Sequence, residues 1–338
     1  PEAVVIRGNA GTYSKHSDEV TDIIKEQVPL FEKASIDEFY ADLSGMDRFF
    51  GCYRYATELR RRIIRETGLP ISFGLSVNKV VSKVATGEAK PNNQLKVDSG
   101  YEKPFLAPLS IKKIPMVGDK TYQTLRNLGL RQVRTIQEMP MEVMQRVLGT
   151  NGGVIWKRAN GIDNRPVVPF CERKSISTER TFDRDTIDVH RLRGILIAMT
   201  ENLAFQLRRG SRLTACIAVK IRYSDFNTYS KQLRIPYTSA DHKLIPKVLG
   251  LFERLYERRL LVRLIGVRFS HLVPGNYQIN LFEDREEILS LYAAMDRMRE
   301  RYGDKSVIRA SGMGARTIGR MHNPFNGQPP PVLAHRKQ

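Results

Sequence analysis

Hydrophobic and polar positions follow two different periods in the first third of the chain. Short β-branched and aromatic runs predict strands over residues 3–6, 34–43 and 71–75. Apolar residues at helical spacing predict helices over residues 17–27, 53–66 and 78–86. Gly68 follows the second helix, where glycine commonly ends a helix. Strands that alternate with helices indicate a mixed α+β layer.

The pattern is clearest over residues 171–273. A strand over 175–182 is followed by a long helix that Asp188 caps and Gly210 ends. Strict alternation then predicts a strand over 213–222, and another strand is predicted over 228–235. A helix over 243–259 and a strand over 261–270 follow. The order is the split β-α-β-β-α-β arrangement. Two helices cover only one face of four strands. The open face is predicted to be basic, with Lys220, Arg222, Lys231 or Arg234, and Arg268.

Between these parts, over residues 107–163, short helical patterns are separated by glycines. Residues 114–120 place a tight turn that ends in Gly118 just before a helix, and Lys120 lies in its first turn. Backbone N–H groups at such a point are directed at an anion. The segment resembles a helix-hairpin-helix clamp for DNA phosphates, although Met116 stands where glycine is usual. An ordinary helical turn is the alternative.

Charge strengthens the nucleic-acid interpretation. The 338 residues include 55 Lys and Arg against 36 Asp and Glu, a net charge of +19, and residues 171–282 alone hold 20 basic and 10 acidic side chains. Such an excess favours a polyanionic partner, with a solvated basic surface as the alternative. No apolar run approaches the roughly 20 residues that span a bilayer. Cys52, Cys171 and Cys216 lie far apart, which disfavours disulfides and structural zinc and indicates a reducing, cytoplasmic compartment.

The strongest chemical signal is the pair Asp37 and Glu38 inside an apolar, aromatic run. Burying two adjacent carboxylates in such a run costs free energy unless a cation compensates their charge. Strand side chains alternate between faces, so the two can share a metal only at a strand end or kink. Paired carboxylates that hold Mg²⁺ suit phosphoryl transfer, and a solvated acidic hairpin is the alternative. Lys90 precedes Pro91, leaves its helix in an extended conformation and is a candidate for a triphosphate, or an ordinary surface lysine.

Four motifs in order make the chain similar to a known family: SIDEFY at 35–40, SVNKVVSKVAT followed by AKPN at 76–92, IPMVG at 114–118, and KSI at 174–176. From residue 1 to about 282 it resembles Y-family translesion DNA polymerases of the bacterial DNA polymerase IV type. The resemblance implies an α+β multidomain fold: a partial ferredoxin-like palm (1–106), a helix-hairpin-helix thumb (107–165) and a split β-α-β-β-α-β little finger (171–273). Residues 274–338 would hold a clamp-binding peptide, a helix over 284–302 and a flexible tail.

The resemblance also implies roles. The protein would be a template-directed DNA polymerase that uses two Mg²⁺ ions, with Asp37 and Glu38 as the second and third acids and Glu38 nearest the primer 3′-hydroxyl. Lys90 would bind the β- and γ-phosphates of a dNTP. Partners would be primer–template DNA and the bacterial sliding clamp, with no membrane and with a monomeric state. The implied DNA-binding residues are Gly118, Lys120, Lys174, Ser175, Lys220, Arg222, Lys231 and Arg268, and the implied clamp-binding residues are Gln278, Leu281 and Phe282.

One departure from the family concerns the start of the chain. The family begins with a strand that bears the first metal-binding aspartate and an aromatic steric gate, and a fingers region follows. No such segment precedes Pro1, so we expect this chain to lack part of the palm and fingers and to be inactive alone. The first acid and the gate are not assigned. A non-catalytic DNA- and clamp-binding protein is therefore the alternative, whereas a helix-hairpin-helix nuclease would need neither the KPN motif nor the clamp peptide.

Overall fold

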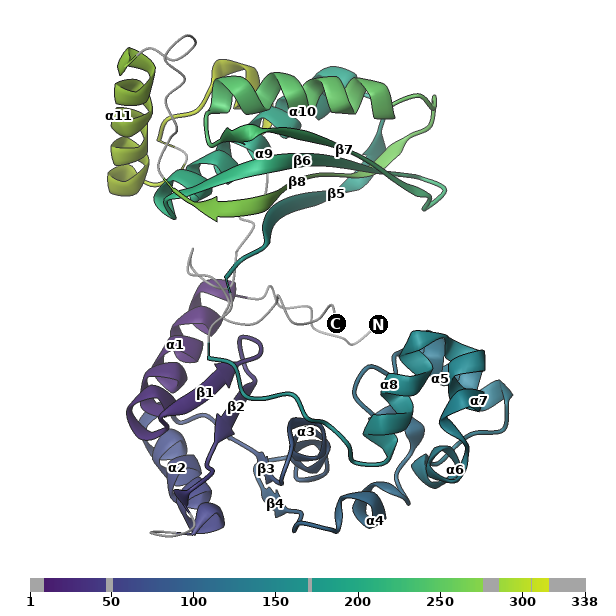
Figure 1. Cartoon of the computed structure of the whole chain (residues 1–338). Coiled ribbons are helices and arrows are strands. Elements are labelled where there is room, and N and C mark those ends of the chain that lie inside the picture. Colours follow the sequence, from purple (N-terminus) through teal and green to yellow (C-terminus); the bar gives the residue numbers. More distant parts are fainter. Residues whose placement is uncertain (1–8, 47–50, 170–171, 276–285, 305, 316–338) are drawn as a thin grey trace, which may run out of the picture. The chain divides into compact units, whose positions relative to one another are not determined.

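The computed structural model describes residues 9–46, 51–169, 172–275, 286–304 and 306–315 (Figure 1). These residues form two compact units, which divide between residues 171 and 172. The first unit therefore contains the α+β layer and the glycine-punctuated helical segment, and the second contains the split β-α-β-β-α-β pattern.

The first half of unit 1 is mixed α/β. The antiparallel strands β1 and β2 form one sheet, and the parallel strands β3 and β4 form another. Helices α1 and α2 share a hydrophobic core around Val20, Ile24 and Ile63. The predicted helices are confirmed, although α1 begins seven residues earlier than expected. The elements are α1 (Ala10–Gln27), β1 (Leu30–Lys33), β2 (Phe39–Asp42), α2 (Cys52–Thr67), β3 (Phe73–Leu75), α3 (Lys79–Glu88) and β4 (Gln94–Lys96).

The strand predicted over residues 34–43 is wrong as a single element. β1 ends at Lys33, residues 34–38 form a turn, and β2 begins at Phe39, so the chain reverses where one continuous strand was expected. Only the second half of the predicted run forms a strand, β2, which is the second arm of a hairpin; the first arm, β1, precedes the run, and alternation alone does not mark where the strand begins. The strand predicted over 3–6 lies outside the described residues.

The second half of unit 1 is helical and packs around α3. Val81 and Val84 of α3 belong to the same core as Leu125 and Ile136 of the helical segment. Gly152 lets two of its helices touch, because a Cβ there would lie 1.9 Å from the carbonyl oxygen of Met144. The elements are α4 (Glu102–Leu106), the 3₁₀ turn η2 (Ile111–Lys113), α5 (Asp119–Asn127), α6 (Val133–Glu138), α7 (Met141–Leu148) and α8 (Thr150–Ala159).

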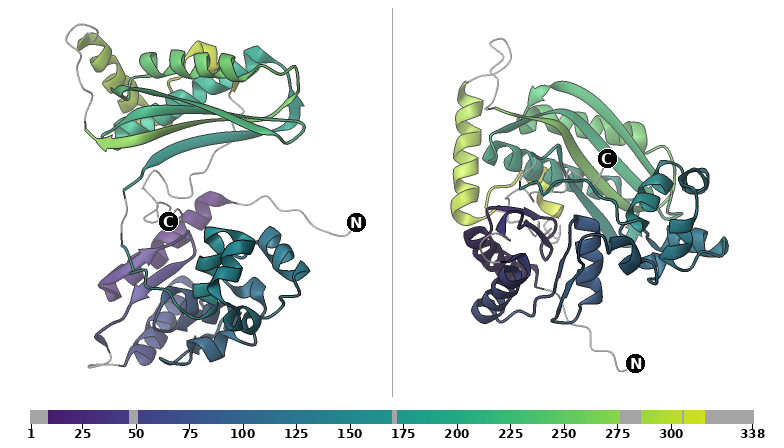
Figure 2. Two further views of the ribbon diagram at one scale, coloured as in Figure 1. Left: turned by 45° about the vertical axis from the view of Figure 1, so that its right-hand side comes forward. Right: turned by 60° about the horizontal axis from the view of Figure 1, so that its bottom comes forward.

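Unit 2 confirms the predicted β-α-β-β-α-β order. Its antiparallel sheet has the strand order β5-β8-β6-β7, and α9 and α10 lie together on one face of it (Figures 1 and 2). Asp188 caps α9 through a bond from the backbone N–H of Arg191, as predicted. The elements are β5 (Ser175–Thr186), α9 (Val189–Arg209), β6 (Arg212–Tyr223), β7 (Thr228–Thr238), α10 (Asp241–Leu255) and β8 (Val262–Pro274).

A C-terminal helix, α11 (Glu286–Tyr302), and a 3₁₀ segment, η3 (Ala310–Ala315), complete unit 2. Buried ion pairs hold α11: the Arg208 guanidinium binds both Asp241 and Asp296. Glu201 of α9 pairs with Arg299 and with Arg309, and its burial raises the pKa of its carboxyl. In the described part of the chain, no helix is long and apolar enough to cross a membrane.

Candidate functional site

The two adjacent carboxylates lie in the turn that joins β1 to β2. The backbone N–H groups of Ala34 and Ser35 both donate to the carbonyl oxygen of Glu38, which closes the turn. The Ser35 hydroxyl donates to Oδ1 of Asp37 at 2.6 Å. Asp37 is exposed and Glu38 is half-buried. Both acids thus precede β2 instead of lying within a strand, and this satisfies the condition under which neighbouring side chains can share a cation.

Lys83 of α3 lies against this turn. Its Nζ is 2.5 and 2.6 Å from the two carboxylate oxygens of Glu38. Asn78 caps α3 by accepting a 3.0 Å hydrogen bond from the Val81 N–H. Gly74 of β3 allows α3 to approach closely, because a Cβ there would lie 2.4–2.6 Å from atoms of the helix. A glycine in β3 and a capped helix therefore set the position from which Lys83 reaches Glu38.

A second lysine of α3 forms a buried ion pair with β1. Lys79 Nζ lies 2.7 Å from Oε2 of Glu32, and the two side chains are only 11% and 5% exposed. The same ammonium donates to the carbonyl oxygen of Pro166 at 2.9 Å, and Oε2 of Glu32 accepts the backbone N–H of Val168 at 2.9 Å. Residues 162–168, which have no regular structure, are thereby bound to β1 and α3 within unit 1.

Tyr40 lies between these two ion pairs. Its ring centroid is 5.3 Å from Lys79 Nζ. Burial, and then the negative charge of Glu38, raise the pKa of its phenol to about 12. Tyr40 therefore stays neutral at every physiological pH and adds no charge beside the acids.

Lys90 lies two residues beyond the end of α3 and is exposed. Arg60 holds the following turn: its Nη2 donates to the carbonyl oxygen and to Oδ1 of Asn92 at 2.6 and 2.8 Å, and its Nε donates to the Ile71 carbonyl at 2.7 Å. No hydrogen bond or ion pair links Lys90 to another residue that the structure describes. The backbone is fixed while the ammonium remains available to a ligand.

The turn before α5 has a left-handed residue where a helix-hairpin-helix usually has glycine. Met116 has φ of 75° and is 56% exposed, so this residue adopts the left-handed backbone that favours glycine. Gly118 caps α5, and the exposed Lys120 lies in its first turn. Arg158 Nη1 donates to the Pro115 carbonyl at 2.8 Å and supports the turn from α8. The free N–H groups at the start of α5 are thus presented on a rigid turn.

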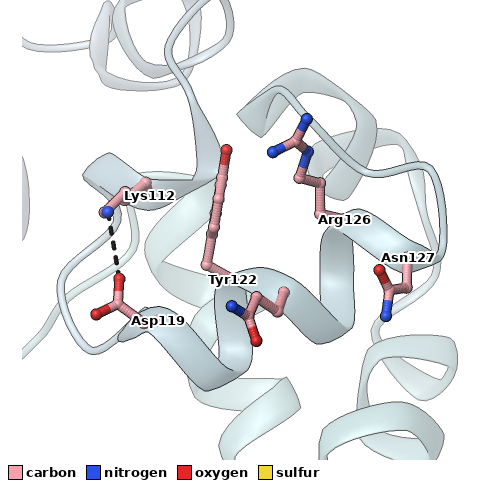
Figure 3. A pocket seen from close by; sticks show the side chains of 6 residues that line it. Lys112, Asp119, Tyr122, Arg126 and Asn127 are labelled. Carbon is pink, nitrogen blue, oxygen red and sulfur yellow. Dashed lines mark ion pairs between the residues drawn. The ribbon is translucent and has the colours of Figure 1, made fainter.

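Beside this turn, unit 1 has a hollow of about 500 Å³ (Figure 3). Tyr122 stands between Lys112 and Arg126, and Lys112 Nζ lies 3.2 Å from Oδ1 of Asp119. The hollow is polar and extends the positive surface around the start of α5. Its lining residues are Lys112, Asp119, Tyr122, Gln123, Arg126 and Asn127.

The strand register of unit 2 shows which side chains share the sheet face without helices. Val219 and Ile221 of β6 belong to the core under the helices, so Lys220 and Arg222 point to the other face. Arg268 of β8 lies opposite Ala218 and shares this face. Lys220 pairs with Glu179 across β8. Three predicted basic residues therefore lie on the open face, together with one acid.

Lys231 is not on that face, and its predicted placement is wrong. It lies opposite Val219, on the helix side of the sheet, where Nζ binds the carbonyl oxygen of Arg254 and Oε1 of Glu257 at the end of α10. At the edge strand β7, the long lysine stem can run past the core and place its charge in water. Arg234, the other candidate, lies in register with Cys216 and belongs to the open-face set.

The remaining predicted residues have mixed positions. Lys174 is exposed just before β5, and Ser175 is the first residue of β5, opposite Ser270. The predicted clamp-binding residues Gln278, Leu281 and Phe282 lie outside the described residues. In the described part of the chain, no group of three or more His, Cys, Asp or Glu side chains gathers around a metal position.

Sequence comparisons identify the relatives of this chain. Residues 1–87 match the model of the impB/mucB/samB family, and residues 173–281 match the model of the impB/mucB/samB family C-terminal domain. The chain is 34% identical over 310 residues to DNA polymerase IV of Dehalococcoides mccartyi (91% of this chain, 80% of the relative). It is 29% identical over 320 residues to DNA polymerase IV of Clostridium acetobutylicum (92% and 79%). The chain belongs to the Y-family of DNA polymerases.

Solved structures agree on the fold of this Y-family polymerase. A chimera of the Y-family polymerases Dbh and Dpo4 has a TM-score of 0.69 at 23% identity, over 81% of this chain and 80% of the chimera. DinB from Sulfolobus solfataricus has a TM-score of 0.53 at 22% identity, over 81% of both chains. The protein is a DNA-directed DNA polymerase of the translesion class, and the comparisons do not favour a non-catalytic DNA- and clamp-binding protein.

Sequence reasoning missed three sets of contacts in this part of the polymerase: Lys83 with Glu38, Lys79 with Glu32, and Arg60 with the turn after Lys90. The motif SVNKVVSK does contain one usable signal, since lysines four residues apart on a helix share a face. Nothing in the sequence identifies their partners, because Glu32 and Glu38 are 47 and 45 residues away along the chain.

Proposed function

We propose that Asp37 and Glu38 form the metal-binding part of the polymerase site and that Lys90 binds the β- and γ-phosphates of the incoming dNTP. One observation carries this proposal. A single turn presents two carboxylates, and the helix packed against that turn leads directly to an exposed, unpaired lysine. Paired acids together with a cationic side chain on the adjoining helix are what metal-assisted transfer of a nucleotide requires.

The donor set fits a divalent cation of the Mg²⁺ type. Carboxylate oxygens are the ligands that Mg²⁺ prefers, and it commonly takes one or two carboxylates together with substrate phosphates. Glu38 already binds a cation in this structure, the ammonium of Lys83, which shows that the turn can orient this carboxylate toward positive charge. We infer a two-Mg²⁺ reaction, in which bound metal would stabilise charge on the attacking and leaving oxygens.

The chain's own residues would then orient the reactants. Ser35 fixes the carboxylate of Asp37, and the closed turn fixes the backbone of Glu38, which we place nearest the primer 3′-hydroxyl. Lys90 would neutralise charge on the triphosphate and on the departing pyrophosphate. Tyr40 remains an uncharged neighbour, because the pKa of its phenol is raised to about 12.

We further propose that residues 1–106 belong to the palm, 107–165 to the thumb and 171–273 to the little finger. Primer–template DNA would contact the turn at Gly118 and Lys120 and the open face of the β5-β8-β6-β7 sheet. Backbone N–H groups at a helix start and cationic side chains are standard ligands of phosphates. The open-face residues in this proposal are Lys220, Arg222, Arg234 and Arg268, preceded in the chain by Lys174 and Ser175.

The bacterial sliding clamp is a further proposed partner, through Gln278, Leu281 and Phe282, by similarity to the clamp-binding peptide of the family. We propose that the enzyme acts as a monomer in the cytoplasm, where DNA and dNTPs are present. Replacing Leu281 and Phe282 together with alanine should abolish binding to the clamp and leave DNA affinity unchanged.

Primer extension tests the site in purified enzyme that also carries the family's first metal-binding aspartate, because the chain by itself is expected to be inactive. Glu38→Gln should reduce single-nucleotide incorporation by about 10²-fold or more with little change in DNA affinity, because only transition-state charge stabilisation is lost. Lys90→Met should chiefly raise the KM for dNTP. Glu58→Gln, an exposed glutamate of α2 that pairs with Arg54, is the matched control and should have no effect. Full activity of Glu38→Gln would overturn the assignment.

A further inference from the structure

The most informative contact outside the assigned roles is the pair of Lys83 with Glu38. The ammonium touches both carboxylate oxygens, at 2.5 and 2.6 Å. The Lys83 ammonium therefore occupies the position in which a metal ion would contact both oxygens of the Glu38 carboxylate. The Lys83 side chain is 39% exposed and that of Glu38 is 43% exposed, so water and ions can reach the pair.

The geometry of α3 allows the ammonium to leave while the backbone stays in place. Val81 and Val84, on either side of Lys83, are fully buried in the core, and the close approach at Gly74 fixes the helix on β3. The four-carbon lysine stem, by contrast, is flexible and carries a well-hydrated charge. Releasing Glu38 therefore requires only a change of side-chain rotamer, without movement of the turn or the helix.

We propose that Lys83 is the counter-ion of Glu38 in the metal-free polymerase and is displaced when a divalent cation binds. This inference rests on the proposed role of Glu38 as a metal ligand. Lys83 keeps the carboxylate ordered and compensates its charge beside Asp37. Metal binding is then an exchange of one cation for another, so Lys83 is a positioning residue that lowers metal affinity by competing for the Glu38 carboxylate.

A purely structural role for Lys83 predicts a different result. A half-exposed ion pair contributes little to folding, and a lysine that only braced Glu38 as a ligand would strengthen metal binding. Removing Lys83 would then leave metal affinity unchanged or weaken it. Only displacement predicts tighter binding without the lysine.

The test is Mn²⁺ binding to the full chain without DNA, measured by the EPR signal of free Mn²⁺. Lys83→Met should bind Mn²⁺ about two- to fivefold more tightly than the wild type, the range for loss of an exposed ion pair. Glu38→Gln should bind more weakly, and adding Lys83→Met to Glu38→Gln should change nothing further. Lys96→Met, which removes a comparable exposed pair with Asp98, should match the wild type.

The outcomes separate the two proposals. Unchanged or weaker Mn²⁺ binding by Lys83→Met, with Glu38→Gln still weakened, would overturn the displacement of Lys83 and leave the metal site standing. Unchanged binding by Glu38→Gln would overturn both. Circular dichroism checks that each variant is folded, and Lys83→Gln provides the same comparison with a side chain that stays polar.

Discussion

The buried pair between Lys79 and Glu32 predicts a large loss of stability when one partner is removed. Lys79→Met deletes the 2.7 Å contact with Glu32, the 2.9 Å hydrogen bond to the Pro166 carbonyl and the cation–π contact with Tyr40. Because Glu32 is only 5% exposed, its charge would remain buried with the Val168 N–H as its remaining hydrogen-bond donor among the described residues. Breaking a buried pair in this way costs about 3–5 kcal/mol.

Lys83→Met is the matched control, because it removes a lysine one turn along the same helix. Its pair with Glu38 is 39% and 43% exposed, so the expected loss is only about 0–1 kcal/mol. The two variants remove the same functional group from α3, but Lys79→Met also removes the contacts with Pro166 and Tyr40. Their difference therefore measures the contribution of the whole buried Lys79 site.

Urea unfolding of unit 1 is directly measurable, because the chain has a single tryptophan. Trp156 packs against the core that contains residues of α3, and its indole N–H donates to the Met139 carbonyl at 2.7 Å. At m-values of about 1–3 kcal/mol/M, a loss of 3 kcal/mol lowers the urea midpoint by about 1–3 M. A midpoint for Lys79→Met no lower than that of Lys83→Met would refute the reasoning.

Proteolysis gives an independent readout of the same contact. Lys79 and Glu32 bind residues 162–168, which contain Val167, and thermolysin cleaves on the N-terminal side of such apolar residues. Lys79→Met should therefore increase the rate of thermolysin cleavage before Val167 under native conditions, whereas Lys83→Met should not. Equal cleavage rates in both variants would show that the ion pair does not hold this segment.

Three further predictions follow from individual side chains. Met116→Gly should raise the free energy of unfolding by about 1 kcal/mol, because glycine relieves the left-handed backbone at φ of 75°, and an unchanged urea midpoint would contradict this. Burial raises the pKa of Tyr40 from its ordinary value of 10.0 to about 12, so stability that is present below pH 10 should fall by at most about 2.7 kcal/mol as the pH rises to 12. Tyr40→Phe should not show that loss in pH-dependent unfolding. Arg268→Ala should weaken DNA binding and reduce its salt slope by about 1, whereas Lys231→Ala should leave the slope unchanged, as measured by fluorescence anisotropy.

Much of the secondary structure follows from the sequence alone. The β-α-β-β-α-β order of unit 2 is correct because alternation and helical spacing are local patterns that its core reproduces. Asp188 caps α9 as predicted, since capping involves only residues three apart. The presence of paired acids at residues 37 and 38, and of a lysine before a proline, is likewise visible without a structure.

Only the tertiary structure decides how these residues are combined. The alternation over residues 34–43 does not reveal that residues 34–38 form the turn of a hairpin and that the strand begins only at Phe39, because the turn is closed by pairing with β1. Edge position decides that Lys231 binds the end of α10 and not the open face. Lys83 meets Glu38, and Lys79 meets Glu32, across more than 40 residues of intervening chain. Such partners are determined by the packing of α3 on β3, and packing depends on the whole core and not on local sequence.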